Sequence, residues 1–241
     1  MKKRFLGVLL SVAMVAAVLA GCGSSGAKET AAPAGSETEA ASEAASGETE
    51  AAGNTGDVIT VGFSQVGAES DWRTANSESM KSTFSTENGY NLIFDDAQQK
   101  QENQIAAIRN FIQQEVDYIV LAPVTESGWD TVLQEAKDAE IPVIIVDRMV
   151  DVSDDSLYTA WVGSNFKLEG QKACEWLKQY AAAKNMSEVN NVDIQGTIGA
   201  SAQIGRTEAL NEAVEANGWN LLAQQTGEFT QAKGQEVMES M

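Results

Sequence analysis

The sequence predicts an α/β fold made of two Rossmann-like lobes, each built on a parallel sheet. From Val58 onward, short runs rich in Val, Ile, Leu and Phe alternate with longer segments of amphipathic helical character. Strands that are apolar along nearly their whole length indicate a parallel sheet covered by helices on both faces. The alternation begins again after about residue 164, which favours two lobes over one large sheet.

The first lobe is expected at residues 58–164. A helix is indicated where Ile105, Ile108 and Ile112 recur at helical spacing, and Asn88-Gly89 marks the end of an earlier helix. Pro123 closes an apolar strand. Strands are predicted at 58–63, 91–96, 117–122, 142–147 and 157–163, and helices at 71–87, 99–114 and 127–139.

The second lobe is expected at residues 165–241. The same signals predict helices at 165–184, 201–217 and 231–241 and strands at 191–195 and 219–225. The chain stops inside the last of these helices, and a lobe matching the first in size would need about 30 more residues. We therefore expect the second lobe to be incomplete and the chain to be truncated after Met241.

The N-terminus has the pattern of a secretory signal. Lys2, Lys3 and Arg4 precede an apolar stretch over 5–19, and Leu19-Ala20-Gly21-Cys22 resembles the bacterial lipobox. The sequence predicts a lipoprotein signal peptide at 1–21 and lipidation of Cys22, which would anchor the protein to the outer face of the cell membrane. The alternatives are an ordinary secreted protein and an uncleaved membrane anchor.

Residues 22–57 are predicted to be the lipidated cysteine followed by an acidic, disordered tether. The segment is dominated by Gly, Ser, Ala, Thr and Glu, and it contains no Val, Ile, Leu or aromatic residue that could form a core. With Cys22 modified, Cys174 is the only remaining cysteine, so no intramolecular disulfide is expected. Cys174 lies in a predicted helix and is expected to be a small buried apolar residue without a reactive role.

Composition excludes several functions. The 241 residues carry 16 Lys and Arg against 35 Asp and Glu, a formal charge of -19, and no histidine. Such a charge argues against binding nucleic acid through its phosphates. Without imidazole there is no Ser-His or Cys-His pair and no histidine ligand for a metal. No metal and no cofactor are expected.

Polar residues follow the predicted strands, where parallel α/β sheets bind ligands. Glu69, Trp72 and Arg73 follow the first strand, and Asp147-Arg148 ends the fourth. Carboxylates accept hydrogen bonds from hydroxyls, arginine donates in a planar fork, and an aromatic ring covers the apolar side of a sugar. Each charged residue alone could instead be a surface charge or a helix cap.

Two other site classes are disfavoured. Residues 196–206 lack the Gly-Lys-Ser/Thr ending of a phosphate-binding loop, and their glycine spacing does not fit a dinucleotide turn. Asp95 and Asp96 suggest a catalytic or metal-binding pair, but adjacent strand residues face opposite ways.

Residues 58–241 resemble the periplasmic binding protein type I family, the sugar-binding receptors of ABC importers, in which the two lobes are joined by a hinge. The similarity is closest to the galactofuranose-binding branch. The matching segments are 61–67 with 69–73, 98–104, 141–148, 194–206 and 227–230 with 233–234.

The resemblance implies a sugar site and its partners. The implied ligand-binding residues are Glu69, Trp72, Arg73, Asp147, Arg148, Arg206 and Phe229. The implied protein is a monomeric extracytoplasmic receptor, not an enzyme, that captures a monosaccharide and delivers it to the ABC permease. There are two alternatives. One is a sugar receptor for a sensor kinase or chemoreceptor, and the other is a secreted glycosidase. A transcription repressor is excluded by the lack of a basic DNA-binding head.

Overall fold

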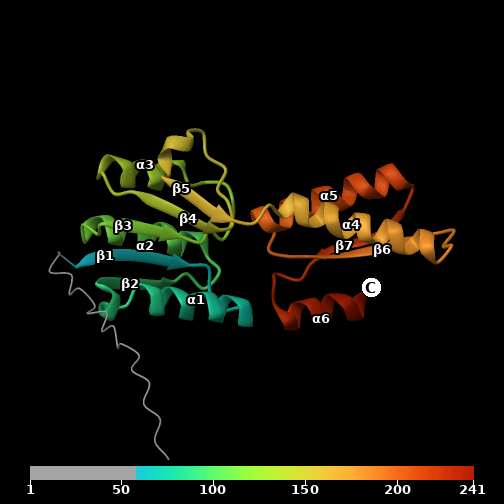
Figure 1. Ribbon diagram of the computed structural model, residues 1–241, viewed down its shortest axis with the longest axis horizontal. Coiled ribbons are helices and arrows are strands. Elements are labelled where there is room, and N and C mark those ends of the chain that lie inside the picture. The colour runs from blue at the N-terminus through green and yellow to red at the C-terminus, as the bar shows by residue number, and fades with distance from the viewer. Residues whose placement is uncertain (1–57) are drawn as a thin grey trace, which may run out of the picture. The chain divides into compact units, whose positions relative to one another are not determined.

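The structure is a computed structural model that describes residues 58–241. The predicted signal peptide, Cys22 and the tether lie outside the described residues. The first sheet has five parallel strands in the order β2-β1-β3-β4-β5 (Figure 1). Its strands are β1 (Ile59–Gln65), β2 (Tyr90–Asp96), β3 (Tyr118–Leu121), β4 (Val143–Asp147) and β5 (Ala160–Gly163).

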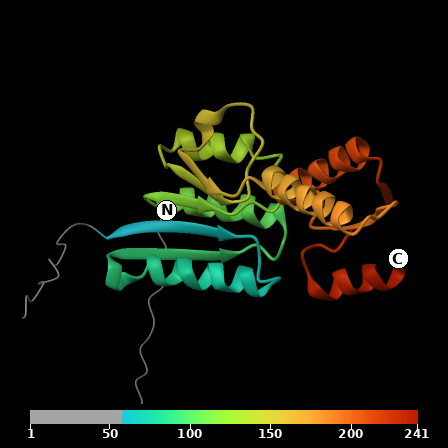
Figure 2. The same cartoon turned by 45° about the vertical axis from the view of Figure 1, so that its right-hand side comes forward.

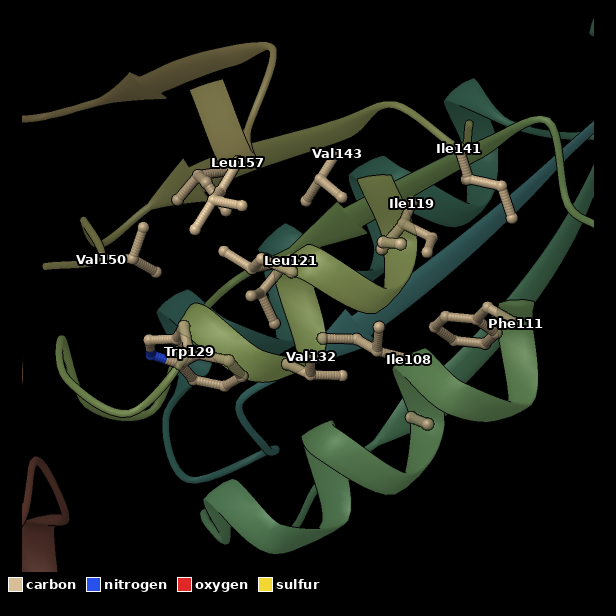
Figure 3. Close-up of a cluster of buried hydrophobic side chains, with 14 of the residues drawn as sticks. Ile108, Phe111, Ile119, Leu121, Trp129, Val132, Ile141, Val143, Val150 and Leu157 are labelled. Atoms are coloured by element: carbon tan, nitrogen blue, oxygen red, sulfur yellow. The ribbon is translucent and has the colours of Figure 1, made fainter. Parts of the chain in front are cut away.

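Helices cover both faces of the first sheet. On one face, α1 (Asp71–Thr83) packs through Met80 onto an apolar cluster that includes Val61 and Phe63. On the other face lie α2 (Gln101–Gln113) and α3 (Asp130–Asp138). Figure 3 shows side chains of α2 and α3 meeting those of β3 and β4, with Trp129 at one end of this larger cluster. This two-sided burial explains the continuous apolar strands.

Gly62 shows why the apolar run of β1 contains a glycine. A Cβ at Gly62 would lie 2.5 Å from the ring of Phe111 on α2. The missing side chain therefore lets α2 approach the strand closely, and the Phe111 ring fills the space.

The second sheet consists of β6 (Asn190–Gln195) and β7 (Asn220–Thr226), which pair in parallel. The helices α4 (Phe166–Ala183) and α5 (Ser201–Asn217) lie on one side of the strands and α6 (Gln231–Ser240) on the other (Figures 1 and 2). Here the strand residues alternate between exposed and half-buried positions. The predicted α/β class with parallel sheets is thus confirmed. The central strands β1, β3 and β4 of the first sheet are largely buried on both faces, whereas the strands of the second sheet are only half-buried or exposed.

Several predicted element boundaries need correction. The first predicted helix ends at Thr83 rather than residue 87, because the side chain of Asn88 donates to the carbonyls of Ser82 and Thr83 and so ends the helix. A short 3-10 turn, η1 (Thr86–Asn88), then leads into β2.

The predicted strand 157–163 is also wrong in its first half. A 3-10 turn, η2 (Asp155–Leu157), occupies that position because the Asp154 side chain accepts from the Ser156 N–H and caps the turn. Leu157 is buried in the larger apolar cluster, and the strand proper begins at Ala160. Likewise the predicted helix 127–139 begins only at Asp130.

Within the range 58–241, none of the helices combines the length and apolar character needed to cross a membrane.

Candidate functional site

A cavity of ≈ 270 Å³ lies at the carboxyl ends of the first-sheet strands, and residues of the helices and loops around the second sheet line its other side. Every predicted ligand-binding residue lines it, together with three that sequence reasoning missed. The lining residues are Glu69, Ser70, Trp72, Arg73, Asp147, Arg148, Phe166, Ala202, Arg206 and Phe229.

Arg73 is placed by the start of α1. The side chain of Ser70 accepts from the Arg73 N–H, so Ser70 caps the helix and sets Arg73 in its first turn. The guanidinium is only 3% exposed. It donates to Glu69 Oε1 at 3.3 Å and to Asp147 Oδ2 at 3.0 Å, which neutralises a buried charge with two carboxylates.

Gln65, a residue that the sequence did not single out, also holds Arg73. Its Oε1 accepts from Arg73 Nη1 at 3.1 Å and from the Val66 N–H at 2.9 Å. Its Nε2 donates to Asn76 Oδ1 and Ser77 Oγ on α1. Gln65 is fully buried at the end of β1, so this network ties the arginine to both the strand and the helix.

Asp147 has an unusual backbone at the end of β4. Its φ is 64°, in the left-handed region that non-glycine residues rarely adopt. Such a conformation costs free energy and persists only where its surroundings enforce it. Here it accompanies the ion pair with Arg73, which joins the ends of α1 and β4.

Arg148 lines the cavity, is buried, and forms no ion pair with a carboxylate of residues 58–241. Its side chain is 4% exposed, and Nη1 donates to the Val124 carbonyl at 3.0 Å. Burial, followed by the positive charge of Arg73, lowers the pKa of Arg148 to about 10. It remains a cation at neutral pH, and a guanidinium has five N–H donors, so donors remain for a ligand.

Glu69 supplies the complementary acceptor. Its Oε1 binds Arg73, whereas its Oε2 is buried and has no hydrogen-bond partner among residues 58–241. A buried carboxylate oxygen without a donor is costly, and a ligand hydroxyl at this position would satisfy it.

Aromatic rings form two walls of the cavity. Trp72 is 56% exposed and lies with its ring 4.7 Å from Arg73 Cζ. Phe229, in the turn after β7, stacks 4.8 Å from Arg148 Cζ. Its ring also presses on Gly196, where any Cβ would collide with it. The glycine is therefore needed for the ring to reach Arg148.

Arg206 reaches the cavity from α5, a helix that packs beside the second sheet. Its Nε and Nη2 both donate to Glu169 Oε2 on α4, at 3.1 and 2.8 Å, and its Cζ lies 5.0 Å from the Phe166 ring. Phe166 was missed by the sequence reasoning. Asn165 could have revealed it: Asn165 caps the start of α4, so Phe166 is the first residue of a helix that follows a strand. Such junctions lie at the carboxyl edge of the sheet, where the cavity is.

Two hydrogen bonds donated by main-chain N–H groups join the two halves beside the cavity. The Glu126 N–H donates to the Gly199 carbonyl, and the Met149 N–H donates to Ser201 Oγ, both at 2.8 Å. Burial and the charge of Asp151 raise the pKa of Glu126.

Three other residues considered in the sequence, Asp95, Asp96 and Cys174, lie away from the cavity lining. Asp95 is half-buried, and burial, followed by the charge of Asp96, raises its pKa, whereas Asp96 is exposed. Cys174 is half-buried, whereas the sequence predicted full burial. Its thiol lies on the side of α4 that contacts α5, where it donates to the Ala209 carbonyl. Burial raises the pKa of its thiol. In the described part of the chain no group of three or more Cys, Asp or Glu could hold a metal ion.

Comparisons with known proteins agree with this geometry. The family model for the periplasmic binding protein domain matches residues 61–241. The chain is 48% identical over 183 residues to the galactofuranose-binding protein YtfQ of Escherichia coli K12, covering 76% of this chain and 56% of that protein.

Solved structures are also similar. A crystal structure from Mycobacterium smegmatis in complex with β-D-fucofuranose has a TM-score of 0.71 at 48% identity, covering 76% of this chain and 60% of that one. The periplasmic component of the arabinose ABC transporter from Shewanella sp. ANA-3, bound to α- and β-L-arabinofuranose, has a TM-score of 0.69 at 50% identity, covering 76% and 59%. The chain spans about half the length of the curated relatives it matches.

Proposed function

We propose that this chain, which belongs to the periplasmic binding protein family, is the substrate-binding component of an ABC sugar importer and captures a furanose between its two lobes. The observation that carries the proposal is the balance of the cavity. Three arginines line it, Arg73, Arg148 and Arg206; Glu69 and Asp147 line it as well, and Glu169, outside the lining, pairs with Arg206. A charge-balanced site with both acceptors and donors suits a neutral polyhydroxylated ligand.

Two residues would grip the sugar directly. The unpartnered Oε2 of Glu69 would accept from one ring hydroxyl, and the remaining N–H donors of Arg148 would bind another. The rings of Trp72 and Phe229 would cover the apolar C–H surfaces. The small cavity volume suits a single monosaccharide better than a drug-sized ligand, for which pockets of about 300–1,000 Å³ are usual.

Binding rather than catalysis is the favoured activity. A glycosidase needs two carboxylates that act independently, on either side of the sugar. Glu69 and Asp147 instead accept from the same guanidinium, that of Arg73. Closure of the lobes on the ligand would present one surface to the permease, a hinge motion common among such receptors. The relatives named for furanose binding favour import over sensing.

Thermal unfolding tests the proposal. With the purified protein, a furanose at about 100 times its Kd should stabilise the fold by about 2.7 kcal/mol, which is a melting shift of several degrees. Arg148→Met should abolish the shift. A broad panel of pentoses and hexoses without any shift would rule out the sugar receptor, and hydrolysis of aryl furanosides would identify an enzyme instead.

We also propose that Cys22 carries the lipid anchor that keeps the receptor on the outer face of the membrane. The support is the lipobox-like segment Leu19–Cys22, outside the described residues. Cells fed radiolabelled palmitate should label the wild-type protein and not Cys22→Ser, which should leave the membrane fraction. Equal membrane retention of both proteins would contradict the anchor.

A further inference from the structure

A second cavity of ≈ 350 Å³ lies beside the first. It is lined by Gln99, Thr197, Ile198, Thr226 and Glu228. Gln99 follows β2 of the first sheet, whereas the other residues belong to the end of β7 and to loops after β6 and β7. Like the sugar cavity, it is therefore built from both sheets at the carboxyl ends of their strands.

The two cavities are adjacent. Gly67 lies between them, because a Cβ on this residue would be 3.0 Å from Glu69 Oε2, in the first cavity, and 3.2 Å from Gln99 Cγ, in the second. On the other side, Glu228 and Phe229 are consecutive residues that line the second and first cavities respectively. A ligand ring held by Glu69 and Phe229 therefore has the second cavity as its neighbour.

Backbone strain marks both cavities. Of the non-glycine residues with positive φ, Glu115, Glu140 and Asn185 follow the ends of helices, where this conformation is common. The remaining ones, Gln98, Gln99, Asp147, Glu228 and Phe229, all follow or end strands at the cavities' edge. In the second cavity, Gln99 and Glu228 have φ values of 61° and 55°. Asp147 and Phe229 show the same left-handed backbone in the first cavity.

The chemistry of the second cavity fits neutral hydroxyl groups. The Glu228 carboxylate accepts, and the Gln99 amide both donates and accepts. Thr197 Oγ1 donates to the Glu228 carbonyl at 3.4 Å, and Thr226 Oγ1 donates to the Gly196 carbonyl at 2.6 Å while accepting from the Glu228 N–H at 3.1 Å. Each hydroxyl oxygen therefore keeps at least one lone pair for a ligand. The lining contains a carboxylate and no cation, which disfavours an anionic substituent.

We infer that the second cavity is a subsite for the exocyclic hydroxyls of a hexofuranose whose ring occupies the first cavity. The inference rests on the proposed function. The terminal exocyclic hydroxyl would donate to Glu228, and the exocyclic hydroxyl nearer the ring would accept from Gln99. The subsite would make the protein prefer a hexofuranose to a pentofuranose with the same ring configuration.

A ladder of sugars with the same ring stereochemistry tests this. D-Galactofuranose carries two exocyclic carbons with a hydroxyl on each, D-fucofuranose lacks the terminal hydroxyl, and L-arabinofuranose lacks the terminal carbon altogether. Affinities are measured by calorimetry and referred to the furanose fraction determined by NMR in the same buffer, because only that fraction binds.

We expect wild-type protein to bind galactofuranose about tenfold more tightly than arabinofuranose, with fucofuranose between them, since a hydrogen bond to a charged group is worth about a factor of ten or more. Glu228→Ala should reduce this ratio to about two or three by weakening galactofuranose binding, whereas Gln99→Ala should weaken both sugars, because arabinofuranose keeps the exocyclic hydroxyl nearer the ring. Glu140→Ala is the matched control: it removes an exposed glutamate with φ of 59° at the end of α3 and should change neither affinity.

Two results would overturn the inference while leaving the proposed function intact. One is equal affinity of wild-type protein for galactofuranose and arabinofuranose. The other is a preference for galactofuranose that survives Glu228→Ala. Failure of all three furanoses to bind wild-type protein would instead remove the proposed function, and the subsite with it.

Discussion

The Asp147 carboxylate lies 3.0 Å from Nη2 of Arg73, although the two residues are 74 positions apart in sequence. Arg73 belongs to the first turn of α1 and Asp147 to the last position of β4. The side chains are 3% and 17% exposed, so water screens the pair little. This ion pair sets the charge balance of the cavity, and the substitutions below test it and its surroundings.

Asp147→Asn should weaken both folding and binding. Asparagine tolerates positive φ, so the backbone is retained while the charge opposite Arg73 is lost. We expect the free energy of unfolding to fall by about 1–3 kcal/mol and furanose affinity by about tenfold. Urea unfolding and calorimetry measure these. Glu87 is exposed, so the control substitution Glu87→Gln should change the free energy of unfolding by less than about 0.5 kcal/mol. An unchanged urea midpoint in Asp147→Asn would contradict a stabilising ion pair.

Gln65→Met should reduce furanose affinity although Gln65 does not line the cavity. Methionine keeps the volume but removes the acceptor for Arg73 Nη1 and the donors to α1, so the guanidinium loses one of its restraints. We expect about a tenfold loss, measured by calorimetry.

A double-mutant cycle distinguishes positioning from general destabilisation. If Gln65 acts through Arg73, the effects of Gln65→Met and Arg73→Met on affinity should be strongly non-additive. The effects of Gln65→Met and Arg206→Met should add, because Arg206 is held separately by Glu169. Additivity in both cycles would show that Gln65 does not position Arg73.

Gly196→Ala should disturb the aromatic wall. Its Cβ would collide with the Phe229 ring, which must then leave its place over Arg148. Overpacking of this kind costs about 1–3 kcal/mol of stability, and furanose affinity should fall about tenfold. Resistance to digestion by trypsin measures the loss of stability, and calorimetry measures the loss of affinity. Gly234→Ala, in α6 with open space around it, should instead stabilise the protein by about 0.5–1 kcal/mol. Wild-type affinity in Gly196→Ala would refute the role of the ring.

Glu126→Gln should stabilise the protein at neutral pH and not at acid pH. Burial raises the pKa of Glu126 in the folded protein, so between the unfolded and folded pKa values the folded state binds more protons. Stability from this group therefore decreases as pH rises through that window and is fully restored below the unfolded pKa, about 4.3.

Melting curves of wild type and Glu126→Gln at pH 4 and pH 7 test the sign. The variant should melt higher than wild type at pH 7, with a smaller difference at pH 4. A larger gain at pH 4 would mean that the carboxylate is stabilised where it lies, beside the main-chain bond from Glu126 to Gly199.

Local pattern predicted the elements that depend on local physics. The buried strands of the first sheet were recognisable because each is apolar along its length, and the carboxyl-end rule then brought Glu69, Arg73, Asp147 and Arg148 to one edge. Boundaries set by side-chain contacts were less accessible. The early end of α1 depends on the Asn88 amide, and composition alone does not reveal that contact.

By itself the sequence determined the fold class, the charge and the residue types available at the strand ends, because apolar periodicity and strand-terminal polarity are properties of neighbouring residues. Only the tertiary structure decided that Gln65 holds Arg73, that Phe166 joins the wall, that Glu69 Oε2 has no donor among the residues the structure describes, and that Gln99 and Glu228 line a second cavity together. These relations join residues from different strands and helices, and they depend on strand order and helix packing, which bring distant segments into contact.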